Sequence, residues 1–254
     1  MNPNKLQLDH SYQRRCKMAK AKDIVKNFDV IAFRDLLVGK RNDGQLYAVD
    51  GQTRRHAALD KNLKMSSVWC SVFNSDGPEH EAEIFRKANG QTGISLRDKV
   101  KALVAEKDPE TLKMKEIVEN AGFELKYYGT TTWPKITTFK SLIVAMENGT
   151  LEDTLDVIGK AYGRMEDGEF CGATSLVIQL PMLPGIEYFI RKFGDLIDLG
   201  DLVCKLRKAS VLDIITEASK KKLSKGSHGI YCAKAIFDYW NKGESKKNRL
   251  KWIK

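Results

Sequence analysis

The sequence lacks several features that would place the protein in a membrane, in an oxidising compartment or among metalloproteins. Its longest apolar runs, such as residues 142–146, fall far short of the roughly 20 residues that a spanning helix needs, and the N-terminus has no apolar signal core. The five cysteines include no C-x-x-C pair, and the four histidines are scattered without ligand spacing. We therefore expect reduced thiols, a cytoplasmic location, no membrane partner and no metal site.

Acidic residues are also too few to balance the basic ones. The 43 lysines and arginines outnumber the 33 aspartates and glutamates, which gives a formal net charge of +10. Such an excess favours a polyanionic partner, most often DNA, although basic runs can also be solvated faces. The candidates for nucleic-acid contact are Lys17, Lys20, Lys221, Lys222, Lys246, Lys247, Arg249 and Trp252. For Trp252, stacking on a base and anchoring of the tail are both open.

The most informative stretch is residues 47–58, where a short apolar segment leads into Asp-Gly-Gln-Thr-Arg-Arg. Gly51 lets the backbone turn without a Cβ clash, and the residues after it are expected to open a helix whose first amides attract phosphate. Arg54 and Arg55 add forked, permanently charged donors. The candidate phosphate ligands in this turn are Gly51, Gln52, Thr53, Arg54 and Arg55. The alternative is an ordinary N-cap followed by two solvated arginines.

Residues 1–93 are predicted to form a small α/β domain. The Asn-Asp-Gly-Gln sequence at 42–45 is typical of a hairpin turn between two strands, and the other elements follow from apolar spacing. The expected strands cover 5–8, 36–38, 46–49 and 67–73, and the expected helices cover 18–28, 52–61 and 79–88.

Residues 94–254 are predicted to form a mainly helical domain with a basic C-terminal tail. Pro181 and Pro184 should interrupt the apolar helical pattern at 172–193. Two helices within 142–162 are separated by a glycine turn, which fits a helix-turn-helix. The second of them carries more acidic than basic residues, so we expect it to pack in the core and not to read DNA.

The order of elements in residues 4–105 resembles the ParB/sulfiredoxin-like domain, and in particular its Asp-Gly-Gln-His-Arg variant from phage and mobile-element proteins. In that family a hairpin leads to a turn that holds nucleotide phosphates, and Gly51-Gln52-Thr53-Arg54 stands at the position of this turn. The resemblance implies a nucleoside triphosphate with Mg²⁺ as a candidate cofactor. It also implies that a second group of residues lies near the same anion, namely Gln13, Arg14, Arg15, Asn89, Gln91 and Thr92. For the last three, an ordinary helix–loop–helix connection is the alternative.

Gln52 departs from the family pattern. ParB proteins usually carry an acidic residue there and sulfiredoxins their reactive cysteine, so the departure argues against both nucleotide hydrolysis and sulfinic-acid reduction. Whether the chain is an enzyme is left open, and the acid–base candidates near the turn are Asp50 and His56, with Asp43 in the preceding hairpin.

The expected fold class is α+β, with a ParB/sulfiredoxin-like mixed-sheet domain at 1–93 followed by a helical domain at 94–254. We expect a nucleic-acid-binding accessory protein of a phage, plasmid or mobile element, in the bacterial host cytoplasm if a phage encodes it. One alternative is a nuclease or nucleotide-dependent phosphotransferase on the same fold. Another is a degenerate protein-interaction module. A homodimer is left open.

Overall fold

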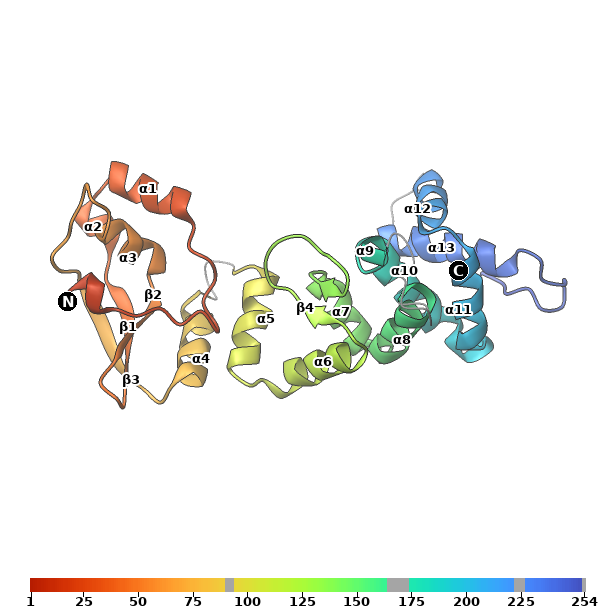
Figure 1. The fold of residues 1–254 in the computed structure, drawn as a ribbon, viewed down its shortest axis with the longest axis horizontal. Helices are drawn as coiled ribbons and strands as arrows, with labels where there is room; N and C mark the ends of the chain where they lie inside the picture. Colours follow the sequence, from red (N-terminus) through yellow and green to blue (C-terminus); the bar gives the residue numbers. More distant parts are fainter. Residues whose placement is uncertain (90–93, 164–173, 222–226, 253–254) are drawn as a thin grey trace. The chain divides into compact units, whose positions relative to one another are not determined.

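The computed structural model describes residues 1–89, 94–163, 174–221 and 227–252, and its fold class is α+β as predicted (Figure 1). The chain divides into two compact units, Met1–Leu112 and Lys113–Lys254. The domain boundary expected at residue 93 lies inside the first unit. No helix among the described residues has the length and apolar character needed to cross a membrane.

The first unit is built on a three-stranded mixed sheet in the order β2-β1-β3. Strand β1 (Leu36–Arg41) pairs antiparallel with β2 (Leu46–Asp50) and parallel with β3 (Cys70–Ser75). The predicted hairpin is confirmed, and Gly44 takes a φ of 80° in its turn. Because β1 lies at the centre, the chain must cross from β2 to the far side of β1 before β3 begins.

Five helices accompany this sheet. The helix after the glycine turn and the helix predicted at 79–88 match the sequence-based expectation within a few residues. The four-residue helix α2 (Val30–Phe33) was not predicted, because it is too short to show helical periodicity. The helices of the first unit are α1 (Met18–Lys26), α2 (Val30–Phe33), α3 (Gln52–Ala58), α4 (Pro78–Asn89) and α5 (Leu96–Ala105).

The strand predicted at residues 5–8 is wrong. Residues Pro3–Lys5 form a 3₁₀ turn, which the Asn2 side chain caps by accepting a hydrogen bond from the Asn4 amide at 2.9 Å. Of the four residues 5–8, all of which the structure describes, Gln7 alone pairs with the sheet, through a single parallel bridge to Tyr47. A proline early in the segment favours the turn, so local capping wins over the apolar alternation.

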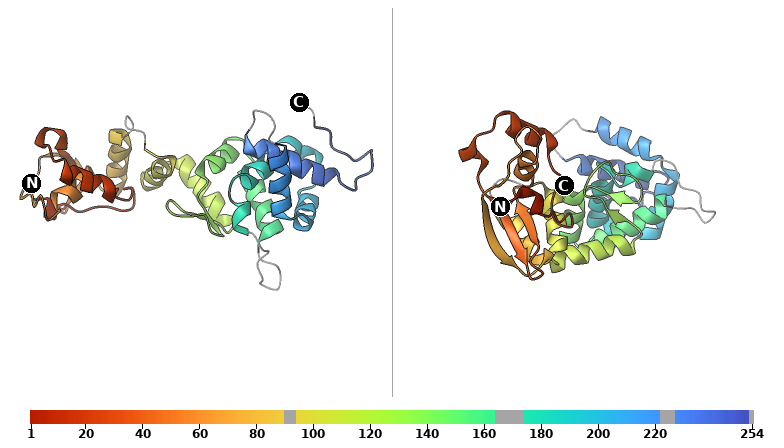
Figure 2. Two further views of the ribbon diagram at one scale, coloured as in Figure 1. Left: turned by 90° about the horizontal axis from the view of Figure 1, so that it is seen from above. Right: turned by 60° about the vertical axis from the view of Figure 1, so that its left-hand side comes forward.

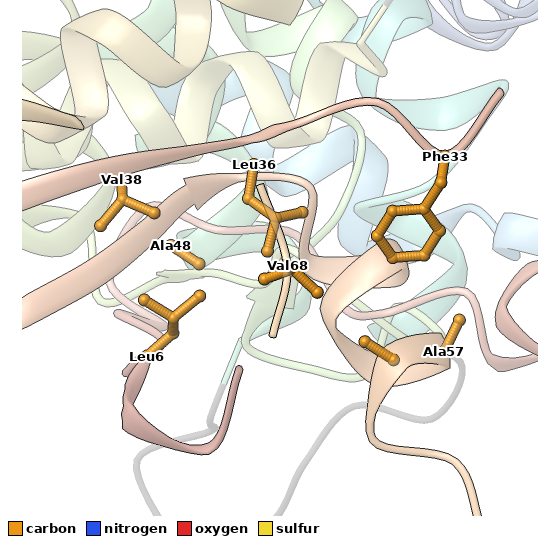
Figure 3. Close-up of a cluster of buried hydrophobic side chains, with 8 residues drawn as sticks. Leu6, Phe33, Leu36, Val38, Ala48, Ala57 and Val68 are labelled. Atoms are coloured by element: carbon orange, nitrogen blue, oxygen red, sulfur yellow. The ribbon is translucent and has the colours of Figure 1, made fainter. Parts of the chain in front are cut away.

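Two apolar clusters hold the sheet between layers of helix and loop. Leu37 and Val38 are neighbours on β1, so their side chains point to opposite faces, and each joins a different cluster. The first cluster packs α3 against the sheet and contains Leu6, Phe33, Leu36, Val38, Ala48, Ala57, Ala58 and Val68 (Figure 3). The second contains Tyr12, Val49, Ala82, Phe85 and Ala102, and it attaches α4 and α5.

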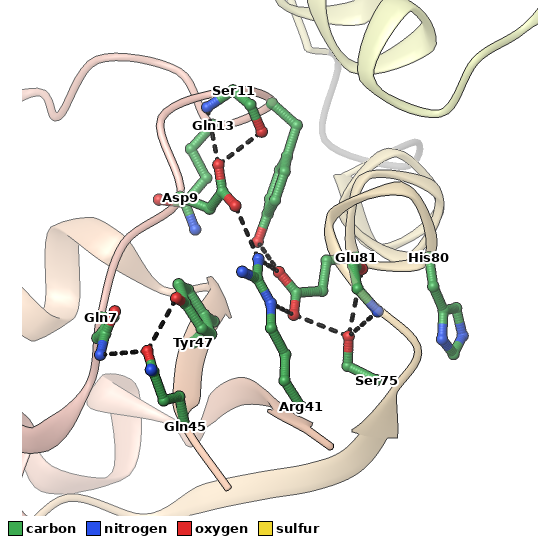
Figure 4. A network of polar contacts seen from close by, with 12 residues as sticks. Gln7, Asp9, Ser11, Gln13, Arg41, Gln45, Tyr47, Ser75, His80 and Glu81 are labelled. Atoms are coloured by element: carbon green, nitrogen blue, oxygen red, sulfur yellow. Dashed lines mark hydrogen bonds and ion pairs between the residues drawn. The ribbon is translucent and has the colours of Figure 1, made fainter. Parts of the chain in front are cut away.

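A polar network fixes the segment that leads to Gln13 (Figure 4). Arg41 donates to both oxygens of the fully buried Glu81, at 2.8 and 2.6 Å, and to Asp9 at 2.7 Å. The Tyr12 hydroxyl donates to Glu81 at 3.1 Å, and Ser75 donates to it at 2.8 Å. Burial, reinforced by Glu81, raises the pKa of Tyr12. The network therefore ties the N-terminal segment, the sheet and α4 together.

The second unit is helical, as expected, with one small parallel pair of strands (Figure 2). Helix α10 (Met182–Phe193) packs against α13 (His228–Asn241) and α8 (Leu151–Tyr162). The approach to α13 is close at Gly185, where a Cβ atom would lie only 2.5 Å from the Cβ of Cys232. The predicted break near Pro181 is confirmed, since α9 ends at Val177 and α10 starts at Met182. Helix α6 (Pro109–Asn120) crosses the boundary between the units. The remaining elements are β4 (Glu124–Leu125), β5 (Lys135–Ile136), α7 (Phe139–Glu147), α8 (Leu151–Tyr162), α9 (Thr174–Val177), α10 (Met182–Phe193), α11 (Leu199–Lys208), α12 (Val211–Lys220) and α13 (His228–Asn241).

Helix α8 is the second helix of the considered helix-turn-helix. It buries one whole face, including Leu155, Ile158 and Tyr162. This agrees with the expectation that the α7–α8 pair packs in the core.

Candidate anion-binding site

A cavity of about 590 Å³ opens beside the glycine turn of the first unit. Its volume lies within the roughly 300–1,000 Å³ that small-molecule sites occupy. Four segments far apart in the sequence supply its walls: the loop before α1 with α1 itself, the α2 region, the turn after β2, and the end of α4. The lining residues are Gln13, Arg14, Lys17, Lys20, Asp23, Ile24, Asn27, Asp29, Ala32, Phe33, Arg34, Val49, Asp50, Gly51, Gln52, Thr53, Arg54, Phe85 and Asn89.

The turn between β2 and α3 requires glycine. Gly51 has a φ of 91°, and a Cβ atom there would lie 2.4 Å from Leu36 Cδ2. The first intrahelical hydrogen bond of α3 runs from the Arg55 amide to the Gly51 carbonyl at 2.8 Å. The amides of Gln52, Thr53 and Arg54 precede that bond, so helix geometry gives them no intrahelical acceptor. The turn thus presents backbone donors and polar side chains along one wall of the cavity.

Basic side chains outnumber acidic ones around the cavity, with five cations against three carboxylates. Arg54 is paired with Asp50, at 3.0 Å between Nη2 and Oδ2. The other two carboxylates are also engaged: Asp23 accepts from Asn27 at 2.9 Å, and Asp29 caps α2 by accepting from two amides. Four basic side chains have no hydrogen-bond or ion-pair partner among the described residues, namely Arg14, Lys17, Lys20 and Arg34.

Gln13 brings a buried acceptor to the cavity. The side chain is 2% exposed, and its Nε2 donates to the Ala48 carbonyl. Its Oε1 has no hydrogen-bond partner among the described residues. Buried carboxamide oxygens normally accept a hydrogen bond, so we expect a ligand N–H or a water to donate one to Oε1. Lys101 of α5 holds the backbone of the same loop by donating to the Gln13 carbonyl at 2.7 Å.

Asn89 lines the same cavity from the end of α4, as the resemblance implied. Its side chain is buried, and Nδ2 donates to the Phe85 carbonyl one turn earlier at 2.9 Å. The two polar residues that were expected to join it, Gln91 and Thr92, lie outside the described residues.

Three of the candidates near the turn do not line the cavity. Arg55 donates through Nε to the Pro3 carbonyl at 3.1 Å, and burial lowers its pKa. His56 is half-buried, and burial, followed by repulsion from Arg55, lowers its pKa. Arg15 is exposed and is not part of the lining. The structure therefore separates Arg54, which the resemblance placed in the phosphate turn, from Arg55, which the sequence had also offered as a phosphate ligand.

The nucleic-acid candidates of the second unit have mixed environments. Lys221 forms an ion pair with Asp238, and Lys222 lies outside the described residues. Lys246 and Lys247 are exposed, and Arg249 Nε donates to the Glu244 carbonyl at 3.2 Å.

Trp252 is held against other aromatic rings of the second unit. Its ring stacks on Tyr188 at 6.1 Å between centroids and meets Phe237 edge-on at 5.3 Å. Lys192 and Lys234 lie over the same ring, at 5.3 and 5.7 Å. These contacts favour the anchoring role for Trp252, whose ring is partly exposed.

Sequence reasoning missed Arg34 and the polar residues around α2. An Asp before a short apolar run is a helix-start signal, and Asp29 does cap α2, but the run of four residues was too short to be assigned as a helix. No group of three or more potential metal-ligating side chains occurs in the described ranges. The excess of basic side chains in the lining is suited to an anion.

Comparison with known proteins gives one family. Neither the curated proteins nor the solved structures contain a match to the chain. A model of a family described as a family of unknown function, DUF6551, matches residues 8–252, from the segment before the polar network to the Trp252 anchor. Since this match covers nearly the whole sequence, the chain belongs to the DUF6551 family.

Proposed function

We propose that the first unit binds a phosphorylated ligand, with a nucleoside triphosphate and Mg²⁺ as the first candidate, in the cavity beside Gly51. One observation carries the proposal: Arg14, Lys17, Lys20 and Arg34, all without a partner among the described residues, line one cavity together with Arg54. Unpaired guanidinium and ammonium groups around a concave site attract phosphate oxygens. The buried Oε1 of Gln13 adds an acceptor for a ligand N–H.

The arrangement of the site supports a ParB/sulfiredoxin-like relationship as part of this proposal. A β-hairpin leads through Gly51 into α3, and Arg54 faces the cavity at the position where that family holds phosphate. The Gln13–Arg14 loop and Asn89 line the same cavity. These are the three elements that the resemblance brings to one anion.

Binding is a better proposal than catalysis at this site. Asp50 is engaged by Arg54, and neither His56 nor Asp43 lines the cavity, so none of the three acid–base candidates is poised as a free general base. A nuclease or phosphotransferase assay with the Arg54→Ala variant as control tests this point. Turnover by the wild type that disappears in the variant would favour the enzyme.

Thermal unfolding with ligands tests the binding proposal directly. Mg²⁺ with CTP or ATP, added at a hundred times the dissociation constant, should stabilise the folded state by about 2.7 kcal/mol. Arg54→Ala should lose most of this shift, whereas Lys22→Ala, on the exposed side of α1 and outside the lining, should keep it. An unchanged melting temperature with every nucleotide would reject the proposal and favour a protein-interaction module.

We also propose that the protein binds nucleic acid, as an accessory protein of a phage, plasmid or mobile element. The net charge of +10 and the exposed Lys246 and Lys247 of the tail support this. Mobility-shift titrations with duplex and single-stranded DNA should show binding that weakens steeply as salt rises. No shift at low salt would reject it, since phosphate contacts are strongest there.

A further inference from the structure

Arg34 occupies a backbone conformation that suits glycine and not arginine. It follows α2 directly, with φ 54° and ψ 169°. This region of φ/ψ space is strained for residues that carry a Cβ atom, and such residues persist only where the surroundings impose them. They are also concentrated at ligand-binding positions.

The neighbours of Arg34 explain why the backbone must turn there. Phe33 is buried and its amide donates to the Asp29 carbonyl at 2.9 Å, which closes α2. Leu36 is fully buried two residues after Arg34, and its amide donates to the Trp69 carbonyl at 2.9 Å. Figure 3 shows Phe33 and Leu36 in the same core cluster. Only two residues connect these anchors, so the change from helix to strand falls on Arg34, where glycine would cost less.

The side chain of Arg34 does not stabilise the turn through any hydrogen bond or ion pair among the described residues. It is exposed, it lines the cavity, and it has no hydrogen-bond or ion-pair partner among the described residues. Asp35, the adjacent carboxylate, forms no ion pair with Arg34 among the described residues; it accepts a hydrogen bond from the Ser71 hydroxyl on β3 and is not part of the lining. The guanidinium therefore reaches the cavity without an ion-pair partner, from a different element than Arg54.

We propose that Arg34 contacts the bound anion and that its charge is retained at a glycine-type position for this reason. The inference rests on the proposed function and deepens it. With Arg34 at the end of α2 and Arg54 at the turn after β2, the site has basic donors on two walls besides the wall formed by α1 and the loop before it. It is thus suited to a ligand with at least two phosphate groups, such as a nucleoside diphosphate or triphosphate. Arg34 is then a residue that sets specificity for polyphosphate over monophosphate.

Arg34→Gly is the informative variant, because it relieves the backbone strain and removes the charge together. The matched control is Lys64→Gly: Lys64 also has a positive φ, of 44°, and is exposed, but it does not line the cavity. Arg54→Ala reports on the proposed site independently. Titration calorimetry of the full chain with MgATP, MgCTP and inorganic tripolyphosphate, and with AMP and CMP as the corresponding monophosphates, measures the affinity. Urea denaturation without ligand measures the stability.

We expect Arg34→Gly to unfold at the same or a higher urea concentration than the wild type. It should bind the triphosphate at least about tenfold more weakly, as loss of a charged hydrogen bond requires. Its affinity for the corresponding monophosphate should fall less. Lys64→Gly should keep the wild-type affinity within about twofold, since a distant exposed charge is screened.

Three results would overturn the inference, and they are distinguishable. If Arg54→Ala loses binding while Arg34→Gly binds as tightly as the wild type, the proposed function stands and the role of Arg34 is rejected. If the wild type binds none of the three triphosphate probes, the proposed function fails, and the inference fails with it. A drop in stability without a change in affinity would assign Arg34 a structural role.

Discussion

The guanidinium of Arg54 lies against the backbone of Gly51, so that a Cβ atom on Gly51 would stand 3.0 Å from Nη2 and 3.1 Å from Nε. The glycine that shapes the turn therefore also leaves room for the arginine that it presents. The ion pair with Asp50, at 3.0 Å between Nη2 and Oδ2, also holds the guanidinium in place.

Gly51→Ala should consequently damage both the fold and the site. The added Cβ meets Leu36 Cδ2 at 2.4 Å at a positive φ, and we expect a loss of about 2–3 kcal/mol in the free energy of unfolding. Gly44→Ala is the control, because Gly44 has a φ of 80° and a Cβ atom added there would meet no atom within 4 Å. It should cost only about 1–2 kcal/mol. Equal losses in urea denaturation would show that the contact with Leu36 is unimportant.

Arg54 and Arg55 should respond oppositely to truncation. Arg54→Ala should abolish most ligand affinity with little change in stability, since the side chain is partly exposed and faces the cavity. Arg55→Ala should lower stability by about 1 kcal/mol, through loss of the hydrogen bond to the Pro3 carbonyl, and keep the affinity. Calorimetric titration and chemical denaturation of both variants measure the separation. Loss of affinity in Arg55→Ala at full stability would contradict it.

Arg41→Ala should be among the most destabilising single changes in the first unit. It leaves Glu81, which is fully buried, without its bidentate partner, and breaking a buried ion pair in this way costs about 3–5 kcal/mol. Removing the exposed Lys87, which pairs with Glu83, should by contrast have no measurable effect on the urea midpoint. A urea midpoint of Arg41→Ala equal to that of the wild type would contradict this role of the buried ion pair.

The first unit should lose stability in acid partly through Asp9. Burial raises the pKa of Asp9, but hydrogen bonds from Ser11 and Arg41 outweigh it and hold the pKa below the usual 3.8. A carboxyl group with a depressed pKa stabilises the fold at pH values above its unfolded pKa and loses that contribution as the pH falls through the folded pKa. The stability difference between the wild type and Asp9→Asn should therefore be constant near neutrality and shrink in the acid range below about pH 4. Denaturation curves across that range measure it, and a difference that does not depend on pH would refute the assignment.

Trp252→Ala should weaken the second unit and leave nucleic-acid binding unchanged. The ring is partly exposed but lies among Tyr188, Phe193 and Phe237, so we expect a loss of about 2 kcal/mol, less than for a fully buried tryptophan. Denaturation followed by fluorescence measures the stability, and mobility shifts measure DNA affinity. Unchanged stability with lost DNA affinity would instead support base stacking.

The sequence predicted the hairpin and the glycine turn because their signals are local. The Asn-Asp-Gly-Gln sequence is itself typical of a hairpin turn. Gly51 marks the second turn because its positive φ, 91°, is a conformation that glycine adopts readily. The helices of the second unit were equally accessible, since their apolar periodicity spans several turns; α11, for example, covers Leu199–Lys208 and buries Leu202, Val203 and Leu206 on one face.

What the sequence could not supply depends on tertiary contacts. Arg54 and Arg55 are adjacent and chemically identical, and only the position of Pro3 decides that Arg55 is used as a structural donor. The involvement of Arg34 depends on the buried positions of Phe33 and Leu36, which no local pattern specifies. For Trp252 the sequence left base stacking and anchoring open, because the rings of α10 and α13 that contact it come from distant parts of the chain.

The parallel pairing of β1 with β3 has a consequence for the order of folding. The hairpin can form early from local contacts, but β3 joins only after the chain from Leu46 to Trp69 has closed into a loop, at an entropic cost that local structure does not repay. The glycine turn and α3 lie within that loop, and Leu36, which lies against the turn, donates its amide to the Trp69 carbonyl. We therefore expect the cavity to be completed only after β3 has paired, because α4, which supplies one of its walls, follows β3 in the chain. A ligand that binds only the completed cavity would then slow unfolding without speeding folding.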